Sequence, residues 1–448
     1  MRAFIASWNW LILVAAVPFL LFPSPERAWV MAVVPVVWLL AWVATGEPLP
    51  RTPLNLTLLL LFVMVLVSLH ATYDAAVSLP KVSGILLGLG AFTVVAYQGR
   101  RASGWWVCLG LFLAVGLGVA VVGFLATRWG AKIDGLALLT TALQPQIVGL
   151  PGAKAGINAN EVAGALLWVL PMSLCLAVLS LAKIRAVWRA LGLGTLPVLA
   201  VLWVAAAALT AVLVLTQSRS AYAGLAIALL VLVGVSLRRT GRLVYAVLLL
   251  LVLVPLLWFA VQVGPGNLWN QWSGDIAGSL DVAANLSGRE VIWHSALQGI
   301  RDFGLTGMGM NTFRGLVHVL YPLPGRFTSD IAHAHNEFLQ AGLDLGVPGM
   351  IAFIALYIGA FAMLFDIWKR SSRSPVDVPG SRKVASPAVG LVARALALGM
   401  GGGLLAHAIY GMTDAVALGA KPGILFWMLL GLICGLHAQS ERLSRDDV

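Results

Sequence analysis

Charged residues are scarce in this chain of 448 residues: Asp, Glu, Lys and Arg together make up 10% of it, whereas apolar residues make up 60%. So few charges cannot cover the surface of a water-soluble domain of this size. The mean hydropathy of +0.93 is also far higher than that of a water-soluble domain. The composition therefore predicts a polytopic membrane protein.

Cysteine is scarce too. Cys108, Cys175 and Cys434 lie far apart within apolar runs, which excludes a disulfide framework and a Cys-rich metal site. No Gly-Lys-Ser or Gly-Lys-Thr phosphate-binding loop occurs, so nothing indicates nucleotide-driven transport. The net charge of +11 is explained by basic residues gathered on one side of a membrane rather than by nucleic-acid binding.

Apolar runs recur twelve times, and a helix needs roughly 20 residues to cross the hydrocarbon core. We expect spans near 5–22, 28–45, 54–70, 82–98, 104–126, 162–181, 192–216, 221–237, 243–263, 347–368, 389–410 and 421–438. The first is interpreted as a retained helix and not as a secretory signal, because many spans follow it.

The predicted fold class is an all-α polytopic membrane protein with about 12 transmembrane helices. We expect transmembrane helices 1–9 within 1–263 and a long periplasmic loop with amphipathic helices at 264–338. Helices 10–12 and a cytoplasmic C-terminus follow within 339–448.

Basic residues set the expected orientation. With the N-terminus inside, the inner segments carry 17 basic residues, the outer segments carry 11, and Arg394 falls inside a run. Short loops follow the positive-inside rule most reliably, so both termini are predicted to be cytoplasmic. Residues 127–161, 216–220, 264–338 and 411–421 then share the outer face.

Two outer segments precede apolar helices. Asn158 and Asn160 lead into the sixth run, where they could cap the helix or hold a polar ligand. In TQSRSAYAG, residues 216–224, Arg219 occupies a short loop between very apolar helices. An arginine there is costly to desolvate unless it meets an anion. It could snorkel to lipid phosphate, but an anionic substrate group is the preferred interpretation.

The third outer segment covers residues 287–313. Helical spacing of Arg289, Trp293, Ala296, Leu297 and Ile300 predicts an amphipathic helix that begins at Arg289. This helix could lie on the membrane surface with Trp293 at the interface. The glycines at 304–309 then turn the chain. A structural role explains Trp293 and the glycines well, but explains Arg289 less well.

The fourth outer segment, residues 332–349, gathers His335, Asn336, Glu337 and Asp344 just before an apolar helix. A histidine there can accept a proton near neutral pH. His333 and His335 resemble a metal-binding pair, but on a helix residues two apart point to different faces. No third ligand completes a recognisable spacing, so no metal is expected.

Together these segments resemble the O-antigen ligase and O-antigen polymerase-like family of membrane glycosyltransferases. HNEFLQAGLDLGVPG resembles its His-Asn-x-x-Leu motif with a following acidic residue and Gly-x-x-Gly, although the family more often has Glu where this chain has Asp344. SGREVIWHSAL with the downstream GMGMNTF resembles its Arg-x-x-x-Trp-x-x-Ala block. TQSRSAYAG and GINANEVAG resemble its Ser-Arg and Asn-x-Asn segments, and the likeness covers nearly the whole chain.

The resemblance implies a ligase that needs neither metal nor other cofactor. It would transfer O-antigen polysaccharide, with inversion, from undecaprenyl diphosphate to the lipid A–core oligosaccharide at the periplasmic face of a Gram-negative inner membrane. Carried over by motif, Arg219 and Arg289 would hold the diphosphate and His335 would activate or orient the acceptor hydroxyl. The residues expected in supporting roles are Asn336, Asp344, Asn158 and Asn160.

Three alternatives remain open. An O-antigen polymerase and an O-linked protein glycosyltransferase would use the same type of donor with another acceptor, and the compact length favours a lipid acceptor over a protein. A transporter of lipid-linked sugars would place its ionisable residues near the bilayer midplane. Here nearly all of them lie at one membrane edge, which favours chemistry at a surface.

Overall fold

The computed structural model describes residues 10–47, 49–150, 153–182, 195–237, 286–322, 331–371, 387–416 and 418–446. Within these ranges every regular element is a helix, and only two isolated bridges pair extended residues. The predicted all-α class is therefore confirmed for this part of the chain. Contacts between residues divide the chain into two compact units.

The first unit comprises Met1–Gly99, Gly266–Ala360 and Gly411–Cys434. Its described helices are α2 (Trp10–Leu21), η1 (Pro25–Ala32), α3 (Val33–Thr45), α4 (Asn55–Ala71), α5 (Ala75–Gln98), α15 (Leu286–Asp302), α16 (Phe313–Leu320), η3 (Lys421–Gly423) and the first parts of α17 (Glu337–Arg370) and α19 (Ile424–Asp446). Helix α5 is central to the N-terminal group, because α2, α3, α4 and η1 all pack against it. Asp74 caps α5 by accepting the Ala76 N–H at 2.8 Å.

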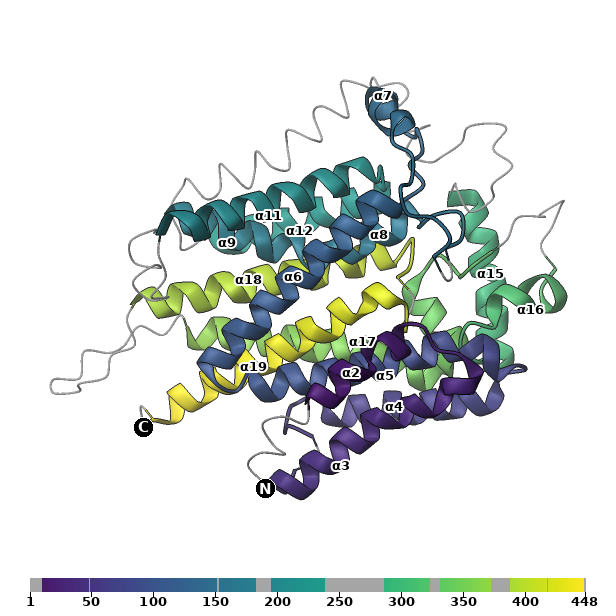
Figure 1. Cartoon of the computed structure of the whole chain (residues 1–448), viewed down its shortest axis with the longest axis horizontal. Helices are drawn as coiled ribbons and strands as arrows, with labels where there is room; N and C mark the ends of the chain where they lie inside the picture. Colours follow the sequence, from purple (N-terminus) through teal and green to yellow (C-terminus); the bar gives the residue numbers. More distant parts are fainter. Residues whose placement is uncertain are drawn as a thin grey trace. The chain divides into compact units, whose positions relative to one another are not determined.

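The second unit comprises Arg100–Pro265, Phe361–Tyr410 and Gly435–Val448. Its described helices are α6 (Ala102–Ala126), α7 (Asp134–Ala142), α8 (Ala159–Leu167), α9 (Leu170–Ala182), α11 (Thr195–Leu215), α12 (Arg219–Leu237), α18 (Pro387–Gly411) and the last parts of α17 and α19. Helices α9 and α11 lie side by side (Figure 1), and α11 also packs against α6 and α8. Helix α11 contains no charged residue, as expected of a helix in lipid, where a charged side chain is costly.

Within the described ranges, six helices are long and apolar enough to cross a membrane: Pro25–Val43, Ala75–Gln98, Ala102–Ala126, Glu337–Arg370, Gly390–Gly411 and Lys421–Arg442. The bent pair α8 and α9 adds a seventh if it forms one span, and shorter apolar helices lie at Leu11–Leu21, Asn55–Ala71, Ala200–Leu215 and Arg219–Val235. Each coincides with a predicted run, whereas the run at 243–263 lies outside the described residues. The chain is thus a helical membrane protein, and the count of about 12 spans remains a prediction.

The sixth predicted run is two helices, α8 and α9, bent by 47° near Trp168. Pro171 has no N–H with which to bond the Leu167 carbonyl one turn earlier, so a straight helix cannot continue through it. Helix α18 packs closely against this break, because a Cβ on Gly403 would lie 2.6 Å from the Trp168 carbonyl oxygen. A proline on one helix and a glycine on another therefore explain the bend.

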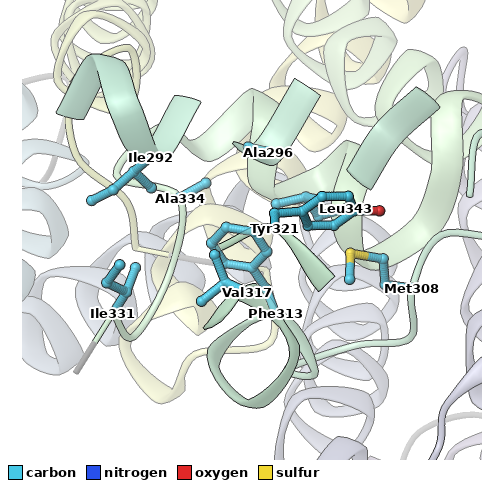
Figure 2. Packing of buried hydrophobic residues seen from close by; sticks show 9 residues of the cluster. All are labelled: Ile292, Ala296, Met308, Phe313, Val317, Tyr321, Ile331, Ala334 and Leu343. Carbon is cyan, nitrogen blue, oxygen red and sulfur yellow. The ribbon is translucent and has the colours of Figure 1, made fainter. Parts of the chain in front are cut away.

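A small apolar core holds the described part of the predicted periplasmic loop together. Figure 2 shows Phe313, Val317 and Tyr321 facing the buried Ile292 and other residues from α15 and the start of α17. The loop segments 264–285 and 323–330 lie outside the described residues. This apolar cluster fixes α15 and α16 against the segment that precedes α17. The same segment carries His335.

Helix α17 is also interrupted at Gly346, whose φ of 70° and ψ of 177° are not helical. The N–H of Val347 donates to the Gly304 carbonyl, and that of Met308 donates to the Leu343 carbonyl, both at 2.7 Å. The glycine-rich turn after α15 therefore docks onto this break. The apolar span predicted from residue 347 begins directly after Gly346. The part of α17 before Gly346 contacts the docked turn.

Replacing Gly346 with alanine is expected to lower the free energy of unfolding by roughly 1–3 kcal/mol. Its backbone conformation disfavours any Cβ, and a Cβ there would also lie 2.8 Å from the Leu305 carbonyl oxygen. The matched control is Gly118→Ala in α6, where a Cβ meets open space. This substitution should leave the free energy of unfolding unchanged or raise it slightly. Thermal unfolding of both purified variants checks this, and equal shifts in Tm would contradict it.

Candidate active site

His335 occupies a strained turn directly before α17. Its φ is +47°, a left-handed conformation uncommon in residues other than glycine. Oδ1 of the next residue, Asn336, accepts the N–H groups of Phe338 and Leu339 at 3.0 Å each and so caps α17. Nδ2 of Asn336 donates to the Met412 carbonyl at 2.9 Å. Asn336 therefore starts the helix and ties the His335 turn to the segment after α18.

Asp414, in that segment, lies between His335 and Arg289. One carboxylate oxygen is 3.4 Å from Nδ1 of His335 and the other is 3.5 Å from a guanidinium nitrogen of Arg289. The Asp414 side chain is 3% exposed, and the His335 and Arg289 side chains are 13% and 12% exposed. A single buried carboxylate thus joins the predicted base to one of the two arginines predicted to bind the diphosphate.

The surroundings of Asp414 keep its carboxylate ionised. Burial on its own raises the pKa of Asp414, but contact with His335 and the positive charge of Arg289 outweigh burial and hold that pKa well below its usual range. An ionised carboxylate beside Nδ1 favours the imidazole tautomer that carries its proton there. In this tautomer Nε2 of His335 carries the lone pair, as in enzymes where a carboxylate orients a histidine base.

His333 lies closer to this cluster than its sequence context indicated. Its ring centroid is 4.3 Å from that of His335, and its Nδ1 accepts the His335 backbone N–H at 3.1 Å. Burial, the neighbouring His335 and the positive charges of Lys81 and Arg289 together lower the pKa of His333 to about 3, although the Asp414 carboxylate acts in the opposite direction. His333 is therefore neutral at physiological pH and supports the His335 backbone.

Helix α15 carries Arg289 into the site and differs in detail from the prediction. It begins at Leu286, and its buried face contains Ile292, whereas Leu297 of the predicted apolar stripe is 53% exposed. The Trp293 indole, expected at the membrane interface, donates from Nε1 to the His335 carbonyl at 3.3 Å. The tryptophan thus holds α15 against the His335 turn.

Asp344 supports the turn that follows α15. Its Oδ1 accepts from Gln340 at 2.9 Å and from the Asn311 N–H at 3.2 Å. Asn311 has a φ of +65°, and its side chain donates to the Val77 carbonyl of α5 at 2.9 Å. These bonds link α17, the turn and α5, whereas Oδ2 of Asp344 is buried and has no hydrogen-bond partner among the described residues.

The other predicted residues belong to the second unit. Asn158 caps α8 by accepting the Asn160 N–H at 2.9 Å, as one of the two sequence interpretations proposed. Asn160 places Oδ1 3.3 Å from Nζ of Lys132, and its carbonyl accepts the Tyr410 hydroxyl at 2.8 Å. Arg219 is the first residue of α12 and is partly buried. The N–H groups at a helix N-terminus favour an anion at that position.

One group in the site has the composition of a metal centre. His333, His335 and Asp414 each offer a ligand atom within 4.8 Å of the others, so Asp414 supplies a third ligand that no sequence spacing indicated. Asp414 nevertheless already has a cationic partner in Arg289. A metal ion would have to share that carboxylate with the guanidinium.

A second group of this composition, Asp366, His437 and Glu441, lies in the second unit. Arg370 contacts the carboxylates of Asp366 at 2.6 Å and Glu441 at 3.5 Å. His437 bonds to Asp366 at 3.0 Å. The arginine provides the positive charge there, so these contacts form an ion-pair network between the ends of α17 and α19.

Asp414 is a charged residue of the cluster that the sequence interpretation missed. It lies in the segment 411–421, which the distribution of basic residues assigned to the outer face, next to apolar helices. A charge at a membrane edge was the available signal. Asp414 does not lie near His335 in the sequence, so their association depends on the fold.

Residues 204–354 match the family model described as O-antigen ligase. No curated protein shows significant similarity to the chain. The matched range contains Arg219, Arg289 and His335 and ends before Asp414. The Ser-Arg, Arg-x-x-x-Trp and His-Asn segments all lie within this range, so this part of the chain is similar to the O-antigen ligase family.

Proposed function

We propose that the protein is an O-antigen ligase, which transfers O-antigen polysaccharide from undecaprenyl diphosphate to the lipid A–core oligosaccharide at the periplasmic face of the inner membrane. The observation that supports this most strongly is the shared carboxylate, since Asp414 contacts both a partly buried arginine and the ring of a histidine. A transferase with a diphosphate leaving group needs these two chemistries together.

In the proposed reaction an acceptor hydroxyl attacks the anomeric carbon of the donor sugar. Its proton passes to Nε2 of His335, and Asp414 stabilises the imidazolium that forms. The new bond joins the hydroxyl oxygen to the anomeric carbon, and the bond from that carbon to the diphosphate oxygen breaks. Undecaprenyl diphosphate leaves with the electron pair. A single displacement of this kind inverts the configuration at the anomeric carbon.

The leaving group gathers negative charge, which Arg289 is proposed to stabilise. Guanidinium groups stay charged and match phosphate oxygens with paired donors. In a site of low dielectric they can supply the stabilisation that a metal ion supplies in other enzymes. Arg219 is proposed to bind the same diphosphate, which rests on its sequence motif and its place at the start of α12.

The alternatives differ in what they would do with the same donor. An O-antigen polymerase would use a second lipid-linked glycan as the acceptor, and a protein glycosyltransferase would use a hydroxyl side chain. A transporter would leave the bond to the diphosphate intact. Release of undecaprenyl diphosphate and the identity of the glycosylated product therefore separate these functions.

Reconstitution of the purified protein with the donor and lipid A–core should yield a polysaccharide-bearing lipid, resolved on a gel, and should release undecaprenyl diphosphate. The yield should survive EDTA with no divalent ion added, because the arginines are proposed to stabilise the diphosphate. Parallel reactions with a lipid-linked glycan or a protein as the only acceptor test the alternatives. Loss of product on chelation and its recovery with magnesium would instead indicate a cation at the diphosphate or at the His333, His335 and Asp414 group.

A further inference from the structure

Gln217, in the turn between α11 and α12, is held in an unusual conformation. Its φ is +51° and it is 1% exposed, two residues before Arg219. A left-handed backbone costs free energy in a residue other than glycine, and it persists only where the surroundings hold it in place. The contacts of the Gln217 side chain are therefore informative.

Every hydrogen-bonding position of the Gln217 amide oxygen and nitrogen is used. Oε1 accepts the N–H groups of Lys132 and Ile133, both at 2.6 Å. Nε2 donates to the Gly130 carbonyl at 2.8 Å and to the Thr140 hydroxyl at 3.1 Å. All of these partners belong to the segment that precedes and forms α7, within the same compact unit. One side chain thus binds the short α11–α12 turn to the outer segment after α6.

Two neighbours of Gln217 in this turn, Thr216 and Ser218, are also buried. Thr216 closes α11 by donating from its hydroxyl to the Leu213 carbonyl. The Ser218 hydroxyl is buried, with its residue 2% exposed, and has no hydrogen-bond partner among the described residues. Arg219 then opens α12, where the helix dipole also favours negative charge. A clamp on Gln217 consequently fixes the point from which the Arg219 side chain emerges.

We propose that Gln217 is a positioning residue for Arg219, which holds the α11–α12 turn in the conformation that binds the diphosphate of the donor. This inference rests on the proposed function, in which Arg219 contacts that diphosphate. Fixing the turn before the ligand arrives lowers the conformational cost of binding. The effect of Gln217 should therefore appear in the affinity for the donor and should depend on Arg219.

The decisive variant is Gln217→Asn, because asparagine tolerates the left-handed backbone but is one methylene too short for the amide to reach its partners. Binding of undecaprenyl diphosphate to this variant is measured. The Kd is expected to be about tenfold higher than that of the wild type, since several hydrogen bonds are lost. Thr140→Val removes one of these bonds and should raise the Kd by about two- to threefold. Gln146→Ala is the matched control, because that exposed glutamine of the same outer segment bonds to the nearby Gln144 carbonyl.

The dependence on Arg219 is tested by a double-mutant cycle. In an Arg219→Ala background, Gln217→Asn should change the Kd for undecaprenyl diphosphate by less than about twofold, because the group that it positions is absent. Thermal unfolding is measured on every variant, so that a loss of affinity can be compared with any loss of stability. Should Gln217→Asn fail to fold, Thr140→Val provides the same cycle with a smaller perturbation.

Three outcomes overturn the inference, and they can be told apart. If Gln217→Asn lowers Tm but leaves the Kd unchanged, the residue is only structural. If its effect on the Kd is undiminished in the Arg219→Ala background, it does not act through Arg219. If Arg219→Ala itself leaves the Kd unchanged, the assignment of Arg219 in the proposed function fails together with the inference.

Discussion

Replacing His335 with alanine is expected to abolish transfer while leaving expression and donor binding largely intact. A general base contributes about 10²–10⁴-fold to a rate, and the ring next to Asp414 is the group proposed to take the acceptor proton. Turnover of purified enzyme with both substrates saturating measures this effect. Binding of undecaprenyl diphosphate, measured separately, should change little, because the proposed diphosphate contacts come from the arginines.

Three further variants sharpen this test. His335→Gln keeps a side chain of similar size but no titratable nitrogen, so near-normal turnover in that variant would remove His335 from the chemistry. His333→Ala should cost far less, since the hydrogen bond of the His333 ring is to the His335 backbone. The exposed His294 on α15 is the control, and His294→Ala should behave as wild type.

Replacing Arg289 with alanine is expected to lower kcat/KM by roughly a hundredfold or more, because a charge-stabilising donor is lost from a buried site. The change also leaves the buried Asp414 without this guanidinium. Arg219→Ala is also expected to lower kcat/KM. Steady-state kinetics at varied donor concentration measure both, with Arg301→Ala as the control, since that arginine lies on the same helix and is exposed.

Lysine at either arginine position separates charge from geometry. Arg289→Lys and Arg219→Lys should restore only part of the activity that alanine removes, because an ammonium group cannot pair with two phosphate oxygens as a planar guanidinium does. Full activity in both lysine variants would mean that paired contacts are unimportant. Full activity in both alanine variants would refute the binding of the diphosphate by these arginines.

The sequence predicted the helices well because long apolar runs leave few alternatives in lipid. It did not predict the bend near Trp168, although Pro171 signals a break, because the run remains uniformly apolar across it. Capping by Asn158 was predictable, since the interaction is local.

The candidate site was predicted only in part, because its contacts join distant parts of the chain. His335 and Arg289 were identifiable as polar residues at a membrane edge, but nothing in their local sequence indicates Asp414 as their common partner. The role of Trp293 was missed for a related reason. A tryptophan near a membrane surface fits an interfacial position equally well, and only the fold reveals its bond to the His335 carbonyl.

The placement of Asp414 outside the matched family range bears on how this chemistry can be engineered. A fragment covering residues 204–354 carries three of the recognisable side chains but leaves Arg289 and His335 without the carboxylate that both contact. Exchanging that stretch between two proteins would pair these side chains with whatever residue the recipient has at the position of Asp414. The proposed site stays whole only when the segment after α18 comes from the same parent.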